Sequence, residues 1–278
     1  MRLLVTGAAG MLGSDVTTAA EAAGHDVTAL ARRDLDLTDA LAVTAAVASV
    51  RPDTIINCAA WTDVDGAEAQ EDLATAVNGA GVAHLARAAD ATGAHLVHVS
   101  TDYVFDGRGT RPYLESDPTA PLSAYGRSKL AGERALDLER AAVVRAAWLF
   151  GAGGGNFAAT MLRLAVERDT VTVVDDQFGF PTYAGHLAPA LVALAERRST
   201  GVLHAHGERP CSWFDFAEAI FARAGREMTV VRGSSADLAR PAPRPAYSVL
   251  GTERSEAPRL PDWHEGLTAY LNELEVSA

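Results

Sequence analysis

The chain has 278 residues, of which 48% are hydrophobic and 22% charged, and its formal net charge at pH 7 is -12. This composition is typical of a folded protein with one large domain, or with two small domains that share a cleft. The acidic excess argues against nucleic acid and anionic membranes as partners, because both attract basic surfaces. No run approaches the roughly 20 apolar residues of a membrane-spanning helix, so we expect a cytoplasmic protein. The cysteines Cys58 and Cys211 lack metal-ligand spacing, and we predict neither a disulfide nor a bound metal.

The first half alternates β-branched runs with Ala-rich helical segments, which is typical of a parallel sheet built from βαβ units. Glycines at 24 and 93 fall where helix ends favour that residue. The pattern therefore predicts an α/β protein with a doubly wound parallel sheet. The predicted strands lie near 2–6, 26–31, 54–57, 95–99 and 142–146, and the predicted helices near 11–23, 39–50, 69–92 and 123–139.

The pattern loosens after about residue 150. It predicts a short strand at 171–174, a helix at 184–197, a strand at 203–205 that returns to the main sheet, and a helix from Ser212 to 224. The Pro- and Ser-rich stretch 233–262 is expected to form mostly loops. We therefore predict two interleaved units: a nucleotide-binding domain of 1–150 plus about 183–207, and a smaller lobe of about 151–182 and 208–278.

A glycine-rich turn follows the first predicted strand and opens a helix. Gly7, Gly10 and Gly13 are spaced Gly-x-x-Gly-x-x-Gly, with Met11 and Leu12 between the last two. Glycines let the backbone approach a pyrophosphate, whose charge is favoured at a helix N-terminus. A turn without any ligand is the alternative, but the strand before it and the helix after it favour a dinucleotide site.

The residues after the second predicted strand bear on the choice of cofactor. An acidic side chain here usually marks NAD, through the ribose hydroxyls, whereas this chain has Ala31-Arg32-Arg33-Asp34. Arg32 and Arg33 favour the extra phosphate of NADPH, although exposed arginines without a ligand are also common and use of NADH stays open. Asp36 and Leu37 are expected near the adenine.

Tyr125 and Lys129 are four residues apart in a predicted helix, which places both side chains on one face. A tyrosine has an ordinary pKa near 10, and a nearby lysine cation would lower that pKa towards neutrality. Alone, such a pair is also common on solvated helix faces. Ser100-Thr101-Asp102 follows a predicted strand, so its hydroxyl groups should lie at the carboxyl edge of the sheet, with Thr101 orienting a carbonyl group.

Together these motifs resemble the extended short-chain dehydrogenases, and more narrowly the dTDP-4-dehydrorhamnose reductase family. The resemblance extends over nearly the whole chain. It rests on the glycine turn, Asn57-Cys58-Ala59-Ala60-Trp61-Thr62, Ser100-Thr101-Asp102-Tyr103-Val104-Phe105-Asp106-Gly107, Tyr125-x-x-x-Lys129, Arg145-Ala146-Ala147-Trp148-Leu149-Phe150, Gly155-Asn156-Phe157, Met161-Leu162-Arg163-Leu164-Ala165, Asp176-Gln177-Phe178-Gly179-Phe180-Pro181-Thr182 and Arg244-Pro245.

The resemblance implies a Rossmann-like fold and NADPH-dependent reduction of the C4 keto group of a dTDP-4-keto-6-deoxysugar, dTDP-4-dehydrorhamnose, to dTDP-L-rhamnose. In that reaction Tyr125 would donate the proton, Thr101 would polarise the keto oxygen and Lys129 would tune Tyr125 and bind the ribose. The other implied cofactor contacts are Ala59, Ala60, Thr62 and Pro181, and the implied substrate contacts are Asp102, Trp148, Asn156 and Arg244.

Several alternatives stay open. Trp148 resembles the family's sugar-stacking residue, with a core tryptophan at a strand end as the less favoured alternative. His98 and His186 are interpreted as packing or surface residues. Cys58 and Trp61 depart from the residues usual in the family. The metal-bridged dimer of some members rests on glutamates without a clear match here, so a homodimer is possible but not predicted.

Two other functions compete with this one. The first is that of a related dTDP-ketosugar reductase or synthase of secondary metabolism, for example one of the dihydrostreptose type. The second is that of a non-catalytic NADP-binding subunit, like the regulatory subunit of methionine adenosyltransferase. The proton donor Tyr125 has no evident use in the latter.

Overall fold

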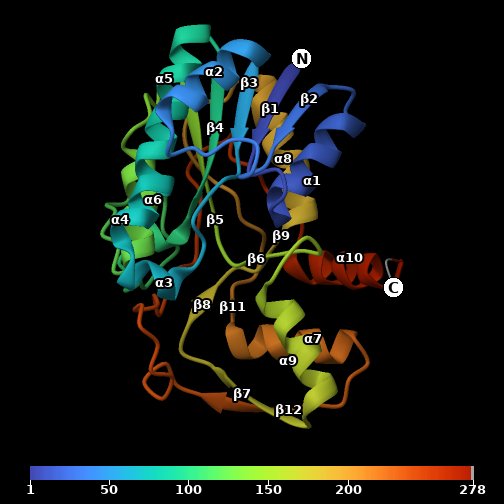
Figure 1. The fold of residues 1–278 in the computed structure, drawn as a ribbon. Helices are drawn as coiled ribbons and strands as arrows, with labels where there is room; N and C mark the ends of the chain where they lie inside the picture. Colours follow the sequence, from blue (N-terminus) through green and yellow to red (C-terminus); the bar gives the residue numbers. More distant parts are fainter. Residues whose placement is uncertain (277–278) are drawn as a thin grey trace.

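Six parallel strands form the central sheet of the computed structural model, which describes residues 1–276. Their order across the sheet is β10-β5-β4-β3-β1-β2 (Figure 1). The doubly wound parallel sheet predicted from the sequence is confirmed, and so is the return of a late strand to its edge. The strands are β1 (Arg2–Thr6), β2 (Asp26–Leu30), β3 (Thr54–Asn57), β4 (His95–Thr101), β5 (Ala141–Ala146) and β10 (Gly201–His204).

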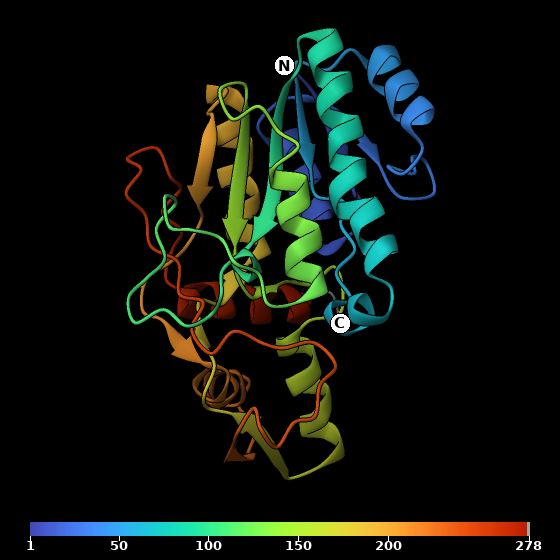
Figure 2. The same ribbon diagram turned by 90° about the vertical axis from the view of Figure 1, so that its left-hand side faces the viewer.

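Helices cover both faces of this sheet because alternate strand residues are apolar on both sides. Leu3 and Val5 of β1 pack into one core with α1 and α8, while Leu4 between them packs into the opposite core with α2 and α5. Figure 2 shows the helices of the second face side by side. The bounds are α1 (Met11–Ala22), α2 (Ala40–Val50), α5 (Gly81–Thr92), α6 (Ala124–Glu133) and α8 (Ala184–Arg197).

The helix predicted for 69–92 is wrong in its bounds and its continuity. The chain becomes helical earlier, because the Asp63 side chain accepts a hydrogen bond from the Gly66 N–H and caps α3 (Val64–Ala69). Gln70, with φ -136° and ψ 43°, separates α3 from α4 (Glu71–Thr75). A π-helical turn, Ala76–Ala80, then precedes α5. Periodicity alone does not reveal such interruptions.

The helix predicted for 123–139 is also too long, because α6 ends at Glu133. The Leu136 N–H donates to the Glu133 carbonyl at 3.2 Å, and the Asp137 carboxylate accepts from the Glu139 N–H at 3.0 Å. A short polar side chain that bonds the local backbone favours a turn over a helix. The chain therefore turns directly into β5.

The rest of the chain gathers beyond the carboxyl edge of the sheet (Figure 1). Ser212 caps its helix as predicted, in a capping box with Asp215. A second strand parallel to the predicted one at 171–174, and a C-terminal helix, were not predicted. The assignment of 151–182 and 208–278 to a separate lobe stays a proposal. The elements here are β6 (Leu149–Phe150), α7 (Phe157–Glu167), β7 (Thr170–Val174), β8 (Phe178–Gly179), β9 (Thr182–Tyr183), β11 (Cys211–Ser212), α9 (Trp213–Arg223), β12 (Thr229–Gly233) and α10 (Trp263–Val276).

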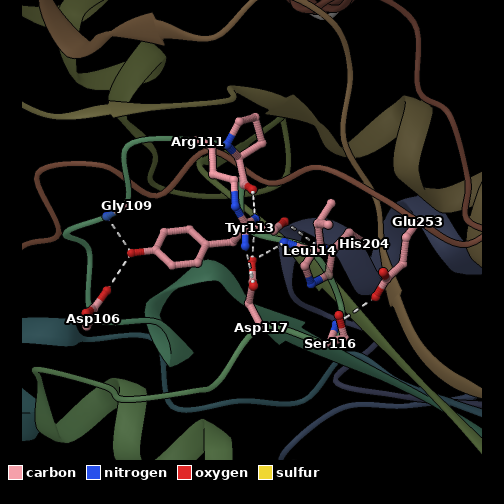
Figure 3. A network of polar contacts seen from close by, with 10 residues as sticks. Asp106, Gly109, Arg111, Tyr113, Leu114, Ser116, Asp117, His204 and Glu253 are labelled. Carbon is pink, nitrogen blue, oxygen red and sulfur yellow. Dashed lines mark hydrogen bonds and ion pairs between the residues drawn. The ribbon is translucent and has the colours of Figure 1, made fainter.

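The loop between β4 and α6 is fastened to β10 and to the C-terminal tail (Figure 3). The Nδ1 atom of His204 lies 2.7 Å from the Gly251 carbonyl oxygen and 3.1 Å from that of Tyr113. The Tyr113 hydroxyl accepts from the Gly109 N–H at 2.7 Å and donates to Asp106.

Among residues 1–276, no helix is long and apolar enough to cross a membrane.

Candidate active site

The strand order reverses between β1 and β3, where neighbouring crossovers leave to opposite faces of the sheet. Ligands of doubly wound proteins bind outside the carboxyl ends of the strands at such a point. A cleft of about 690 Å³ opens there. It is lined by most of the residues predicted to bind the cofactor or the substrate or to take part in catalysis. These are Gly7, Gly10, Met11, Leu12, Gly13, Arg32, Asp36, Leu37, Ala59, Ala60, Thr62, Thr101, Asp102, Tyr125, Lys129 and Trp148.

The glycine turn packs too closely for larger residues. Gly7 has φ +71°, and a Cβ atom there would lie 2.5 Å from the Ala59 backbone nitrogen. A Cβ atom on Gly13 would lie 2.2 Å from the Gly7 carbonyl oxygen. Within residues 1–276 no side chain caps α1 at Gly10, so the N–H groups of its first turn face the cleft. This backbone fits a diphosphate.

Two carboxylates in the loop after β2 accept hydrogen bonds from residues of that same loop. The Asp34 side chain accepts from the Ala31 N–H at 3.0 Å and does not line the cleft. Asp36 accepts from the N–H and hydroxyl groups of Thr38, which lower its pKa, and Arg32 contributes to the same shift. Arg32, two residues after the end of β2, lines the cleft, whereas Asp34 does not.

Tyr125 lies in the first turn of α6, where Ser123 caps the helix by accepting from the Gly126 N–H at 3.1 Å. Its ring meets that of Tyr103 edge to face, with centroids 5.7 Å apart. Burial and then the charge of Asp102 raise the pKa of Tyr125 to about 12, although the neighbouring Thr101 hydroxyl lowers it. The phenol is therefore protonated at neutral pH.

Lys129 has other partners in this structure, and its predicted role of lowering the pKa of Tyr125 stays a prediction. The Lys129 amine donates to the Val99 carbonyl at 2.7 Å and lies 3.4 Å from His98 Nε2. Burial lowers the pKa of Lys129 to about 8, with Glu133 and Cys58 acting in the opposite direction. The spacing of four residues places Tyr125 and Lys129 on one helix face, but burial decides the direction in which the pKa of Tyr125 shifts.

Thr101 is the last residue of β4, Asp102 follows it, and both line the cleft. The Thr101 hydroxyl donates to Asp102 at 3.0 Å and accepts from the Tyr103 N–H at 3.2 Å. Burial raises the pKa of Asp102 to about 6, although the neighbouring hydroxyl groups of Ser248 and Thr101 lower it. Ser100 has a different partner, because its hydroxyl donates to Glu133 at 2.5 Å.

Trp148 is positioned by an unusual backbone and a close neighbour. Its φ is +48°, and its indole stacks on that of Trp213 with centroids 3.6 Å apart and planes 7° from parallel. A Cβ atom on Gly179 would lie 2.6 Å from the indole. Both tryptophans line the cleft, so an aromatic face is available to a sugar ring.

Three predicted contacts, Pro181, Asn156 and Arg244, are not among the residues that line this cleft. Asn156 caps α7 by accepting from the Ala159 N–H at 3.0 Å, and its amide donates to the Gly151 carbonyl at 2.7 Å. Arg244 pairs with Asp65 at 3.2 Å. Asn156 and Arg244 thus already have partners within the protein, and their assignment to the diphosphate stays a prediction.

Other residues at the site were not predicted. Asn78, inside the π-helical turn, accepts from the Trp61 N–H at 2.8 Å and donates to the Ser128 hydroxyl at 2.9 Å. It joins the loop after β3 to α6, and a π turn is often found beside a functional site.

Within residues 1–276, no group of three or more His, Cys, Asp or Glu side chains is arranged to hold a metal ion.

Comparison with known proteins places this architecture in a family. The model of the RmlD substrate binding domain matches residues 1–276. The chain belongs to the dTDP-4-dehydrorhamnose reductase family. It is 49% identical to the dTDP-4-dehydrorhamnose reductase of Streptomyces griseus, over 96% of this chain and 92% of that protein. The resemblance inferred from the motifs is thereby confirmed.

Two further comparisons bear on substrate and cofactor. A dTDP-4-keto-6-deoxy-D-glucose reductase of Streptomyces niveus is 48% identical over 90% of this chain and 88% of its own length. The crystal structure of a dTDP-4-dehydrorhamnose reductase from Bacillus anthracis in complex with NADP superposes with a TM-score of 0.94 at 36% identity, covering 98% of this chain and 99% of that one. This chain and the Bacillus anthracis protein thus share the fold over nearly their full lengths.

Proposed function

We propose that the protein reduces the C4 keto group of dTDP-4-dehydrorhamnose to give dTDP-L-rhamnose, with NADPH as the reductant. One observation carries the proposal: Thr101, Tyr125 and Lys129 line the same cleft as an uncapped, glycine-rich helix N-terminus. A module that only binds a nucleotide has no need of a buried proton donor, which disfavours a regulatory subunit. The names of the relatives support the same reaction.

The residues present fit a dinucleotide. The first turn of α1 would hold its diphosphate, Arg32 its additional phosphate, and Tyr125 and Lys129 its nicotinamide ribose, with Ala59, Ala60 and Thr62 along one side. Bound NADPH supplies the hydride for the keto carbon. Tyr125, a neutral phenol, gives its proton to the keto oxygen. The Thr101 hydroxyl donates to Asp102 here, so it must rotate towards the substrate to polarise that oxygen.

The experiment that tests this proposal mixes the purified protein with NADPH and freshly generated dTDP-4-dehydrorhamnose. Loss of reduced-nicotinamide absorbance together with formation of dTDP-L-rhamnose is the expected result. The Streptomyces niveus relative, almost equally identical, makes reduction of another dTDP-ketosugar the second candidate. Product analysis with several ketosugars separates the two, and cofactor binding without oxidation of any of them would reject both.

Arg32→Ala is expected to weaken NADPH binding by about tenfold while leaving NADH binding unchanged, because a charge-assisted hydrogen bond to phosphate is lost at a solvent-exposed position. Fluorescence titration with both cofactors measures the two dissociation constants. Arg33→Ala is the matched control, since Arg33 pairs with Asp34 at 3.7 Å and does not line the cleft. Equal losses for NADPH and NADH would contradict the phosphate assignment.

Gly179→Ala is expected to raise KM for the nucleotide sugar about tenfold, because its methyl group would force the Trp148 indole out of position. The dissociation constant of NADPH should not change. Gly155→Ala serves as the control, since an added Cβ there meets no atom within 4 Å. If Gly179→Ala leaves KM at the wild-type value, Trp148 does not position the sugar.

A further inference from the structure

A chain of buried polar groups runs beneath the cleft from β1 to Lys129. The Thr6 hydroxyl donates to Asn57 Oδ1 at 2.7 Å, Asn57 Nδ2 lies 2.9 Å from His98 Nδ1, and His98 Nε2 lies 3.4 Å from the Lys129 amine. All four side chains are buried, and those of Asn57 and His98 have no exposed surface. The chain therefore has to satisfy its hydrogen bonds internally.

The orientation of the Asn57 amide follows from a neighbour that can only donate. The Ala59 backbone N–H points at Asn57 Oδ1 from 3.0 Å, so that position must be the oxygen. The amide nitrogen then faces His98 and donates to its Nδ1 atom. Nδ1 is an acceptor and carries no proton.

The proton of the His98 ring must therefore be on Nε2, because burial keeps the pKa of His98 well below its usual value and the ring neutral. This Nε2–H group faces the Lys129 amine. An ammonium ion has only donors, so a charged Lys129 would set two N–H donors against each other. A neutral amine instead accepts from His98 and donates to the Val99 carbonyl.

Among residues 1–276, Glu133 and Cys58 are the groups that act on the charge of Lys129, and neither provides an unshared negative charge. Glu133, one turn further along α6, is bonded to Arg145 through both carboxylate oxygens. Burial raises the pKa of the Cys58 thiol to about 12, which keeps it neutral, and Tyr125 is a neutral phenol. The lowered pKa of Lys129 agrees with this arrangement.

We propose that His98, held by Asn57, disfavours the ammonium form of Lys129 in the cofactor-free protein, and that in alkaline solution cofactor binding adds one solvent proton to the neutral amine. The ribose hydroxyls of a dinucleotide accept hydrogen bonds from an ammonium ion and so favour its charged form. The step forms one N–H bond and involves no redox change. His98 and Asn57 are thus positioning residues, and the uptake rests on the cofactor site proposed above.

The tautomer of His98 is measurable without any ligand. Long-range ¹H–¹⁵N correlation spectra of the cofactor-free protein should show His98 protonated at Nε2. His204 is the internal control with the opposite tautomer, because its Nδ1 atom faces the carbonyl groups of Gly251 and Tyr113. A His98 ring that is protonated at Nδ1, or at both nitrogens, would overturn the proposal.

Proton uptake is measured by calorimetric titration with NADPH in buffers of different ionisation enthalpy. Linkage predicts uptake of about 0.9 proton at pH 9 and almost none at pH 6, with affinity falling by up to about tenfold per pH unit above pH 8. Uptake near zero at pH 9 would refute the proposal. If NADPH does not bind at all, the cofactor assignment fails, and the His98 tautomer decides this proposal alone.

Asn57→Asp separates this role from a merely structural one. The substituted carboxylate still accepts from Thr6 and Ala59, but it also accepts from His98, so the ring proton should move to Nδ1. The Nε2 lone pair then receives a charged Lys129, and uptake at pH 9 should fall below about a third of the wild-type value. An unchanged tautomer and unchanged uptake in a folded variant would refute the relay through Asn57.

Discussion

Tyr125→Phe is expected to lower kcat by about 10²- to 10⁴-fold, because it removes the proposed proton donor while keeping the ring. The phenol is buried and neutral at the pH of the assay, and within the cleft Lys129 is engaged by Val99 and His98. Stopped-flow measurement of reduced-nicotinamide absorbance under single-turnover conditions would give the rate of the chemical step directly.

The control for that variant is Tyr247→Phe, which removes a phenol outside the cleft and should change kcat by less than about threefold. NADPH affinity should also stay within about tenfold in Tyr125→Phe, since only one hydroxyl contact is lost. A variant that keeps more than about a tenth of the wild-type kcat would show that another group delivers the proton.

Glu133→Gln is expected to reduce the free energy of unfolding by about 3–5 kcal/mol, because it leaves a buried guanidinium without its counter-charge. Arg145 and Glu133 form a bidentate salt bridge, with Nε 3.0 Å from Oε1 and Nη2 2.7 Å from Oε2. Their side chains are only 4% and 6% exposed. His204 Nε2 lies 3.3 Å from the same guanidinium. Urea denaturation followed by circular dichroism measures the change.

Glu167→Gln provides the comparison, since it breaks the exposed Arg163–Glu167 pair and should cost less than about 0.5 kcal/mol. If Glu133→Gln and Glu167→Gln reduce the free energy of unfolding by similar amounts, the Arg145 guanidinium does not depend on the charge of Glu133. The Ser100 hydroxyl also donates to Glu133, so Ser100 connects β4 to α6.

The sheet was predictable because its strands are apolar on both faces and alternate with helices at regular intervals. Helix ends were harder, because they depend on side-chain bonds such as those of Asp63 and Asp137. The part of the chain beyond the carboxyl edge of the sheet contains strands of only two residues, for example β8 and β11, which are fixed by pairing across the chain instead of by local pattern.

For the candidate site, the glycine turn and the pair Tyr125 and Lys129 were predictable, because their spacing carries the chemistry. His98 was interpreted as a packing residue, since its partner Asn57 lies on another strand, 41 positions earlier in the sequence. Trp213 likewise meets Trp148 only in the folded chain. Asn156 before an apolar helical run carried a recognisable capping signal that points to the role it has in the structure.

The place of β10 constrains how this protein can be altered. It completes the edge of the main sheet, yet in sequence it lies between β7 and α9, which both belong to the part beyond the carboxyl edge. A single crossover point therefore cannot exchange that part with a relative's. A chimera meant to transfer sugar preference would need two separate segments grafted together, and we expect divergence among such enzymes to proceed by point substitution more readily than by recombination.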